Sequence, residues 1–115
     1  MPRGRAEQIV AAVTSWEGVE AAPHRFGGVE LRLGHRELGH LHGDAIADLP
    51  FPLCIRDELI ADGRARRHHF LPDSGWVTVP LDGPDGAARA IELFRLSYDR
   101  ATQARKRLPS RTRSR

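Results

Sequence analysis

Two short stretches joined by a tight turn constrain the fold of this chain most strongly. In "VELRL", the apolar residues Val29, Leu31 and Leu33 alternate with Glu30 and Arg32, which is typical of a strand with one buried face. The turn "GHR" and a returning strand, "ELGHLHG", follow directly. Because so short a turn joins only antiparallel neighbours, we expect an antiparallel sheet around this hairpin.

Amphipathic helices are predicted at both ends of the chain. Residues 5–16 place Ile9 and Val13 at helical spacing, and residues 87–107 carry an apolar stripe that includes Phe94. Helices at the two ends of the chain can cover one face of an antiparallel sheet and leave the other face open.

Between the hairpin and the last helix, the sequence predicts a helix over residues 53–62 and two further strands, "RARRHHFL" and "WVTVPL". The segment "DAIADLPFP" contains Asp48, Pro50 and Pro52, which are typical of turns, and it is interpreted as a connection. With an extended segment over residues 19–22, the expected order is α-β-β-β-α-β-β-α. We therefore predict a two-layer α+β fold in which helices cover an antiparallel five-stranded sheet.

Length and charge indicate one domain followed by a basic tail. A chain of 115 residues, 40% of them hydrophobic, suits a single modest core. From Arg100 onward seven residues are basic and none is acidic, whereas the preceding residues hold 11 basic and 15 acidic side chains, a formal net charge of −4. We predict one domain over residues 1–101 and a disordered basic tail over residues 102–115. Such a tail can contact nucleic acid or another anionic surface weakly, without reading its sequence.

Neither a membrane span nor a disulfide framework is expected. No apolar run approaches the roughly 20 residues that cross a bilayer, and "MPRGRAEQIV" lacks the features of a secretion signal, so we expect a cytoplasmic protein. Cys54 is the only cysteine, which excludes an internal disulfide and a multi-cysteine zinc site. Its neighbours Leu53 and Ile55 indicate that Cys54 is packed inside.

The returning strand "ELGHLHG" carries the most prominent candidate for chemistry. Residues two apart in a strand point the same way, so His40 and His42 are expected on one face with Leu38, and Glu37 and Gly39 on the other. Two imidazoles at this spacing can bind one divalent metal ion.

Such a metal site needs further ligands. Asp44 and Asp48 follow the strand, and one of His68 and His69 can contribute, since adjacent strand residues face opposite sides. If the protein is catalytic, we expect the histidine pair to act as acid and base or as metal ligands, with Asp44 assisting.

A polar pocket without a metal is the first interpretation of these residues, and the metal site is the second. Histidine and arginine side chains on the sheet suit anion binding or proton transfer near neutral pH. The residues predicted to bind the ligand are His24, Arg32, Arg36, His68, His69, Asp73 and Trp76. A purely structural role for these side chains stays open as well.

The "HLH" pair also fits a class of nucleases in which two strand histidines hold a divalent metal and a helical tyrosine attacks a DNA phosphate. Here Tyr98 lies on the last predicted helix, and a basic tail is available. Against this, Tyr98 shares the apolar stripe of its helix, which favours a place in the core.

Three blocks of sequence carry a resemblance to a known family. They are "WEGVEAAPHRFGGVELRLGHRELGHLHGD", "ADLPFPLCIRDELIADGRARRHHFLPDSGWVTVPL" and "RAIELFRLSYDRA". In these blocks the chain resembles the small bacterial, actinobacterial-type proteins called luciferase-family or luciferase-domain proteins. The most specific pieces are "ELGHLHGD", "DLPFP", the "HH" pair and "PDSGW".

This resemblance implies a family whose activity is undefined, and its label does not by itself imply light emission. A flavin-dependent luciferase is a barrel of about 250 residues, and an adenylating one needs a nucleotide site. We therefore predict a luciferase-domain protein that binds a small anionic or metal-bearing ligand in a histidine- and arginine-lined pocket. A nucleic-acid-associated protein or metal-dependent nuclease, and a non-catalytic interaction domain, are the alternatives.

Overall fold

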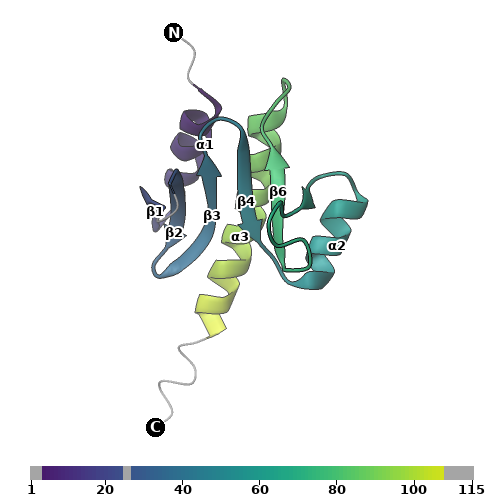
Figure 1. Cartoon of the computed structure of the whole chain (residues 1–115). Helices are drawn as coiled ribbons and strands as arrows, with labels where there is room; N and C mark the ends of the chain where they lie inside the picture. Colours follow the sequence, from purple (N-terminus) through teal and green to yellow (C-terminus); the bar gives the residue numbers. More distant parts are fainter. Residues whose placement is uncertain (1–3, 25–26, 108–115) are drawn as a thin grey trace.

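The chain builds one antiparallel sheet and three helices, seen in a computed structural model that describes residues 4–24 and 27–107. The elements are α1 (Arg5–Thr14), β1 (Val19–Pro23), β2 (Val29–Leu33), β3 (Arg36–His42), β4 (Ile46–Pro50), α2 (Leu53–Ala61), β5 (Arg66–Arg67), β6 (Trp76–Pro80) and α3 (Gly86–Arg107). The sheet order is β1-β2-β3-β4-β6-β5, and all neighbouring strands are antiparallel (Figure 1). Strands β3 and β4 therefore lie at its centre.

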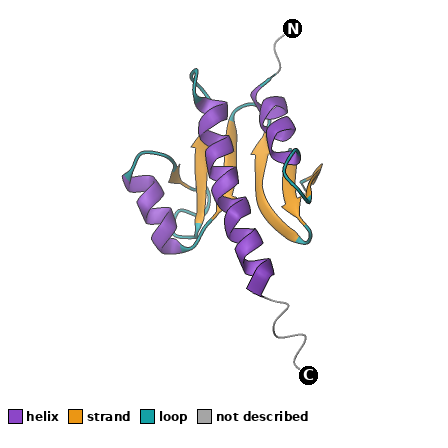
Figure 2. Cartoon of the chain, turned by 180° about the vertical axis from the view of Figure 1, so that it is seen from behind, coloured by secondary structure: helices purple, strands orange, loops and turns teal. Residues whose placement is uncertain are grey.

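Helices α1 and α3 lie against one face of the sheet, whereas α2 lies to the side, next to β5 (Figure 2). The core forms between these two helices and the sheet, where Ile9 and Val13 of α1 and Leu93 and Phe94 of α3 are completely buried. This arrangement confirms the predicted α+β fold with two layers and an antiparallel sheet.

The sheet has six strands, one more than predicted, so the order of elements is α-β-β-β-β-α-β-β-α. The additional strand is β4, whose Asp48 and Pro50 resemble turn residues. Ala47 and Leu49 of this strand are completely buried in the core, and this burial outweighs the local turn signals. Pro50 is the last residue of β4, where its missing N–H removes at most one ladder hydrogen bond.

The second half of the chain differs from the prediction in two further places. Strand β5 contains only Arg66 and Arg67, so His68 and His69 lie in a loop and are free of strand alternation. Helix α2 buries Arg56 rather than Cys54, which is exposed. The expectation that Cys54 is packed inside is therefore wrong.

A β-bulge changes which side chains of β3 share a face. Gly39 pairs with Leu31, but Glu37 pairs with the next residue, Arg32, so Leu38 is an extra residue in β3. Leu38 is completely buried in the core, whereas Glu37 lies on the opposite, histidine-bearing side. The faces predicted for Glu37 and Leu38 are thus exchanged, because the bulge breaks the alternation between them and the histidines.

Gly39 allows helix α3 to approach β3 closely. A Cβ atom at this position would lie 2.7 Å from Cε1 of Phe94 and 2.8 Å from the backbone oxygen of Asp48. Both distances are shorter than real Cβ contacts, and the second atom belongs to the backbone of a central strand. Glycine at this place therefore sets the spacing between the helix layer and the sheet.

Within residues 4–24 and 27–107, no helix is both long and apolar enough to cross a membrane. Helix α3 extends to Arg107 and so includes residues 102–107, the first part of the predicted tail. Residues 108–115 lie outside the described part of the chain, and the predicted disorder of that segment stays a prediction.

Candidate functional site

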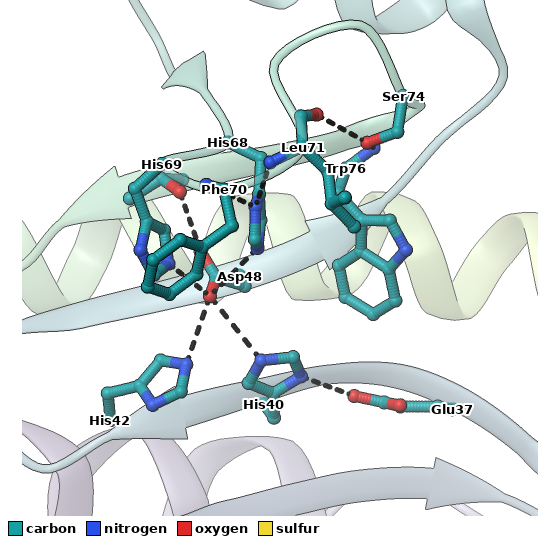
Figure 3. A network of polar contacts seen from close by, with 11 residues as sticks. Glu37, His40, His42, Asp48, His68, His69, Phe70, Leu71, Ser74 and Trp76 are labelled. Atoms are coloured by element: carbon teal, nitrogen blue, oxygen red, sulfur yellow. Dashed lines mark hydrogen bonds and ion pairs between the residues drawn. The ribbon is translucent and has the colours of Figure 1, made fainter. Parts of the chain in front are cut away.

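A pocket of about 540 Å³ lies on the sheet face opposite α1 and α3. Strands β3, β4 and β6 supply its floor, and the loop after β5 supplies one wall (Figure 3). The lining residues are His24, Glu37, His40, His42, Asp48, His68, His69, Phe70, Leu71 and Trp76. The pocket thus joins five imidazoles and two carboxylates to three large apolar side chains.

The carboxylate of Asp48 is the centre of this pocket, and its side chain is completely buried. Four imidazole Nε2 atoms point at one oxygen, Asp48 Oδ2, at 3.1 Å from His42 and His69 and at 3.4 Å from His40 and His68. We call these five residues the Asp48 cluster. The second carboxylate oxygen, Oδ1, accepts a hydrogen bond of 2.6 Å from the hydroxyl of Thr78.

Sheet register explains why these side chains meet. His40 of β3 is directly opposite Asp48 of β4, and Asp48 is directly opposite Thr78 of β6. Residues paired across neighbouring strands share a face, and their side chains lie within contact distance. The three polar groups therefore form a row across the centre of the sheet. The hydrogen bonds of Asp48 outweigh its burial, which by itself raises the pKa, and hold the pKa of this carboxyl well below its usual range.

Glu37 fixes the orientation of His40. Its Oε2 lies 2.6 Å from His40 Nδ1, a contact that exists because the β-bulge brings Glu37 to this face. Burial by itself lowers the pKa of His40, but hydrogen bonds with Asp48 and Glu37 and their negative charges together raise it to about 9.

His68 is held in a defined orientation by the loop that follows it. Its Nδ1 accepts hydrogen bonds of 3.1 Å from the backbone N–H groups of both Phe70 and Leu71. Burial lowers the pKa of this imidazole, and although the charge of Asp48 opposes the effect, the net shift is downward. The prediction that only one of His68 and His69 faces the site is wrong, because the strand ends at Arg67 and both rings turn toward Asp48.

The walls of the pocket are aromatic and aliphatic. His24 stacks on His40 with ring centroids 4.0 Å apart, and Trp76 lies on another side of His40 at 5.3 Å. Phe70 and Leu71 are 79% and 53% exposed, so these neighbouring residues form an exposed apolar wall beside the polar cluster.

Arg56 anchors the loop that carries these apolar residues. Its side chain is buried, and it donates hydrogen bonds to the backbone oxygens of Ser74 at 2.8 Å and Pro72 at 3.4 Å. The wall formed by Phe70 and Leu71 is therefore tied to helix α2.

Several predicted site residues lie elsewhere. Arg32 pairs with Glu30 at 3.3 Å, and neither Arg32 nor Arg36 lines the pocket. Asp73 has a fully exposed side chain, 3.9 Å from Arg67. Within residues 4–24 and 27–107, the pocket lining therefore contains histidines and no arginine, in contrast to the predicted histidine and arginine lining. His24, His40, His42 and Trp76 are brought together as predicted, and both His68 and His69 join them. The binding or catalytic roles of these residues stay predictions.

Asp44 lies outside the pocket and has a structural contact. Its Oδ1 accepts a hydrogen bond of 2.8 Å from the backbone N–H of Ala6 in the first turn of α1, where N–H groups have no partner within the helix. Asp44 thus caps α1 from a turn far away in the sequence. It was predicted to assist catalysis, but it does not belong to the Asp48 cluster.

Replacing Asp44 by Ala should lower the free energy of unfolding by about 1 kcal/mol, the usual effect of losing a helix cap. Urea denaturation followed by circular dichroism measures this change. Asp82→Ala, which removes another exposed acid, serves as the control and should stay within about 0.5 kcal/mol of the wild type. Equal losses in both variants would contradict the capping role.

Sequence reasoning did not foresee three features of the pocket. Glu37 was expected on the other face, since a bulge has no clear local signal in "RELGH". The sequence suggested that Asp48 is a turn residue and an additional metal ligand, and did not suggest that it is the centre of the pocket. Its position between the apolar residues Ala47 and Leu49 is the signal of a strand that could have revealed it. The apolar wall depends on the path of a loop.

Among the residues that the structure describes, three groups of side chains have ligand atoms close enough to hold a metal ion. They are His24 with Glu37 and His40, His40 with His42 and Asp48, and Asp48 with His68 and His69. The last two groups share Asp48 and together make up the whole Asp48 cluster, so metal binding at one of them involves the other.

The fold and site define a small α+β protein with a histidine-rich pocket on an open sheet face. A family model described as luciferase domain matches residues 35–97, which is more than half of the chain and includes the complete Asp48 cluster. The chain belongs to the luciferase-domain family. Searches of the curated proteins and of the solved structures found no significant match.

Proposed function

We propose that this luciferase-domain protein binds a small organic ligand in the pocket above the Asp48 cluster. The main observation behind this proposal is that the pocket combines a buried polar floor with an apolar wall. In the described part of the chain the exposed large apolar residues are Leu53, Phe70 and Leu71, and two of these three line the same pocket. Small-molecule sites typically combine an apolar wall with a few convergent polar groups.

The composition of the pocket indicates the chemistry of the ligand. Trp76, Phe70 and Leu71 suit an aromatic or branched apolar body, whereas the imidazoles suit a polar end group. That end group is either an anion, which imidazolium can attract, or a group that binds a metal ion held by the cluster. We therefore infer a ligand with one apolar and one polar end.

Binding can be measured through Trp76, because the chain has only two tryptophans. In the variant Trp16→Phe, Trp76 is the single reporter. We expect benzoate or benzohydroxamate to change its emission saturably, with an affinity about 10-fold higher than that of benzyl alcohol, which lacks the charged or metal-binding end group. Replacing Phe70 by Ser should weaken this binding by about 10-fold, because the ligand loses an apolar contact.

The matched control is Trp76→Phe, which keeps Trp16 as the reporter. Trp16 lies beside Tyr98, with ring centroids 5.4 Å apart, and should show no response to the same compounds. Equal responses from both tryptophans, or equal affinities for all three compounds, would exclude the proposed pocket.

The nuclease alternative has little support from the geometry. It needs a tyrosine hydroxyl near the histidine pair, but the hydroxyl of Tyr98 donates a hydrogen bond of 2.8 Å to the backbone oxygen of Glu17. Binding of nucleic acid by the basic segment from Arg100 onward, and a role as an interaction domain, stay predictions.

A further inference from the structure

The Asp48 cluster brings too many imidazole nitrogens to one carboxylate oxygen. Four Nε2 atoms lie within 3.4 Å of Asp48 Oδ2, whereas a carboxylate oxygen has about two lone-pair directions for hydrogen bonds. Oδ1 is already engaged by Thr78. Hydrogen bonding to Asp48 therefore does not account for all four rings.

The second ring nitrogens distinguish these four histidines. His68 Nδ1 accepts hydrogen bonds from two backbone N–H groups, so a neutral His68 carries its proton on Nε2, which faces Asp48 Oδ2 at 3.4 Å. By contrast, His40 Nδ1 faces the carboxylate of Glu37 at 2.6 Å. A proton on that nitrogen leaves the Nε2 lone pair of His40 available in the neutral ring.

His42 and His69 complete the count of ligand atoms. Both are partly exposed at the pocket, and the Nε2 of each lies 3.1 Å from Asp48 Oδ2. With their protons on Nδ1, they offer two more Nε2 lone pairs. Together with His40 and Asp48, the cluster then provides three imidazole nitrogens and one carboxylate oxygen.

Charge and ligand type both favour a transition metal. Glu37 and Asp48 bring two carboxylates to a small, partly enclosed volume, which favours a cation. Imidazole ligands suit zinc, iron, cobalt, nickel and copper, whereas magnesium and calcium prefer an all-oxygen set. The contacts of Glu37 with His40 and of Thr78 with Asp48 resemble the hydrogen bonds that orient metal ligands in proteins.

We propose that His40, His42, His69 and Asp48 bind one divalent transition-metal ion, and that His68 positions Asp48 without binding the metal. The ligands come from β3, β4 and the loop after β5. His40, His42 and Asp48 already have ligand atoms within 4.8 Å of one another, whereas His69 forms such a group with Asp48 and His68. The loop therefore has to bring His69 closer to the β3 histidines when the metal binds. This inference deepens the proposed function and rests on it in one respect, namely that the metal forms the floor of the ligand pocket and receives the polar end of the ligand.

The test uses the full-length protein, stripped with a chelator and titrated with Co²⁺, which absorbs visible light according to its ligands. We expect a saturable visible absorption band and displacement of Co²⁺ by Zn²⁺. His42→Ala and His69→Ala should each lower the affinity by at least about 100-fold, and His68→Ala by only about 10-fold with the band shape kept, as for a group that orients a ligand. His42 and His69 are about one third exposed, so these variants leave little buried space.

The matched control is His35→Ala, which removes an exposed histidine outside the pocket and should bind Co²⁺ like the wild type. Absence of a band in the wild type, or equal affinity in His42→Ala and wild type, would overturn the metal site. Loss of the band in His68→Ala would overturn the role assigned to His68. Benzoate binding to the chelated protein, measured by the emission of Trp76, separates the two proposals. If benzoate binds but no metal band forms, only the metal site is excluded. If a metal band forms but neither benzoate nor benzohydroxamate binds, only the ligand pocket is excluded.

Discussion

Asp48→Ala should lower the free energy of unfolding of the chelated protein by about 3–5 kcal/mol, because it removes one partner from a buried charged network. The Asp48 side chain is completely buried and accepts contacts from both neighbouring strands, through His40 of β3 and Thr78 of β6. An alanine leaves these donors without an acceptor and adds a cavity at the centre of the sheet. Urea denaturation with a chelator present measures the effect on the fold separately from any metal.

Asp48→Asn separates the shape of this residue from its charge. The amide keeps an oxygen for the Thr78 hydroxyl but cannot accept from the imidazoles on its NH₂ side, so we expect a smaller loss of stability than for alanine. The comparison with Asp44→Ala, at about 1 kcal/mol, separates a buried central carboxylate from an exposed helix cap. If Asp48→Ala unfolds at the same urea concentration as the wild type, a stabilising role for this carboxylate is ruled out.

Gly39→Val should cost about 3 kcal/mol of stability, because it forces side-chain atoms into a fully packed layer. The first added atom alone would meet Phe94 Cε1 at 2.7 Å and the backbone oxygen of Asp48 at 2.8 Å. Phe94 is completely buried in the core, and the Asp48 oxygen belongs to the backbone of strand β4. Thermal unfolding followed by circular dichroism should therefore show a clearly lowered midpoint.

Ala21→Val on strand β1 is the control, because it adds the two γ-methyl groups of valine at an exposed position of the same sheet, where a Cβ atom is already present. Its effect should stay within about 0.5 kcal/mol. Equal stability of Gly39→Val and Ala21→Val would mean that α3 does not need the close approach. A Gly39→Val protein that is destabilised but still binds Co²⁺ would place the effect in the core rather than in the Asp48 cluster.

The fold class was accessible from the sequence because its main signals are local. The alternation in "VELRL" and the apolar spacing of the terminal helices each depend on residues close together in the chain. Strand β4 was missed because Asp48 and Pro50 carry local turn preferences, and only the buried neighbours Ala47 and Leu49 reveal that tertiary packing overrides them.

The site was predictable only where strand spacing alone decides it. His40 and His42 share a face because they are two residues apart. Glu37 reaches the same face through a bulge that depends on pairing with β2, and His69 joins His68 because β5 ends early. Residue type also misled: Arg32 pairs with Glu30, and Asp44 caps a helix 38 residues before it. When a charged residue is close in sequence to the residues of a site, the sequence does not reveal which partner its side chain contacts in the fold.

The one-sided covering of the sheet has a consequence for how this protein can change over evolution. Along β4 and β6, residues that stabilise the core alternate with residues that face the pocket, such as Val77 with Trp76 and Ala47 with Asp48. A mutation can therefore alter the specificity of the open face while the helix-covered face keeps the chain folded. Asp48 is the exception, because its buried carboxylate faces the pocket and also links β4 to β3 and β6 through His40 and Thr78. We expect the walls of the pocket to diverge among relatives long before this aspartate does.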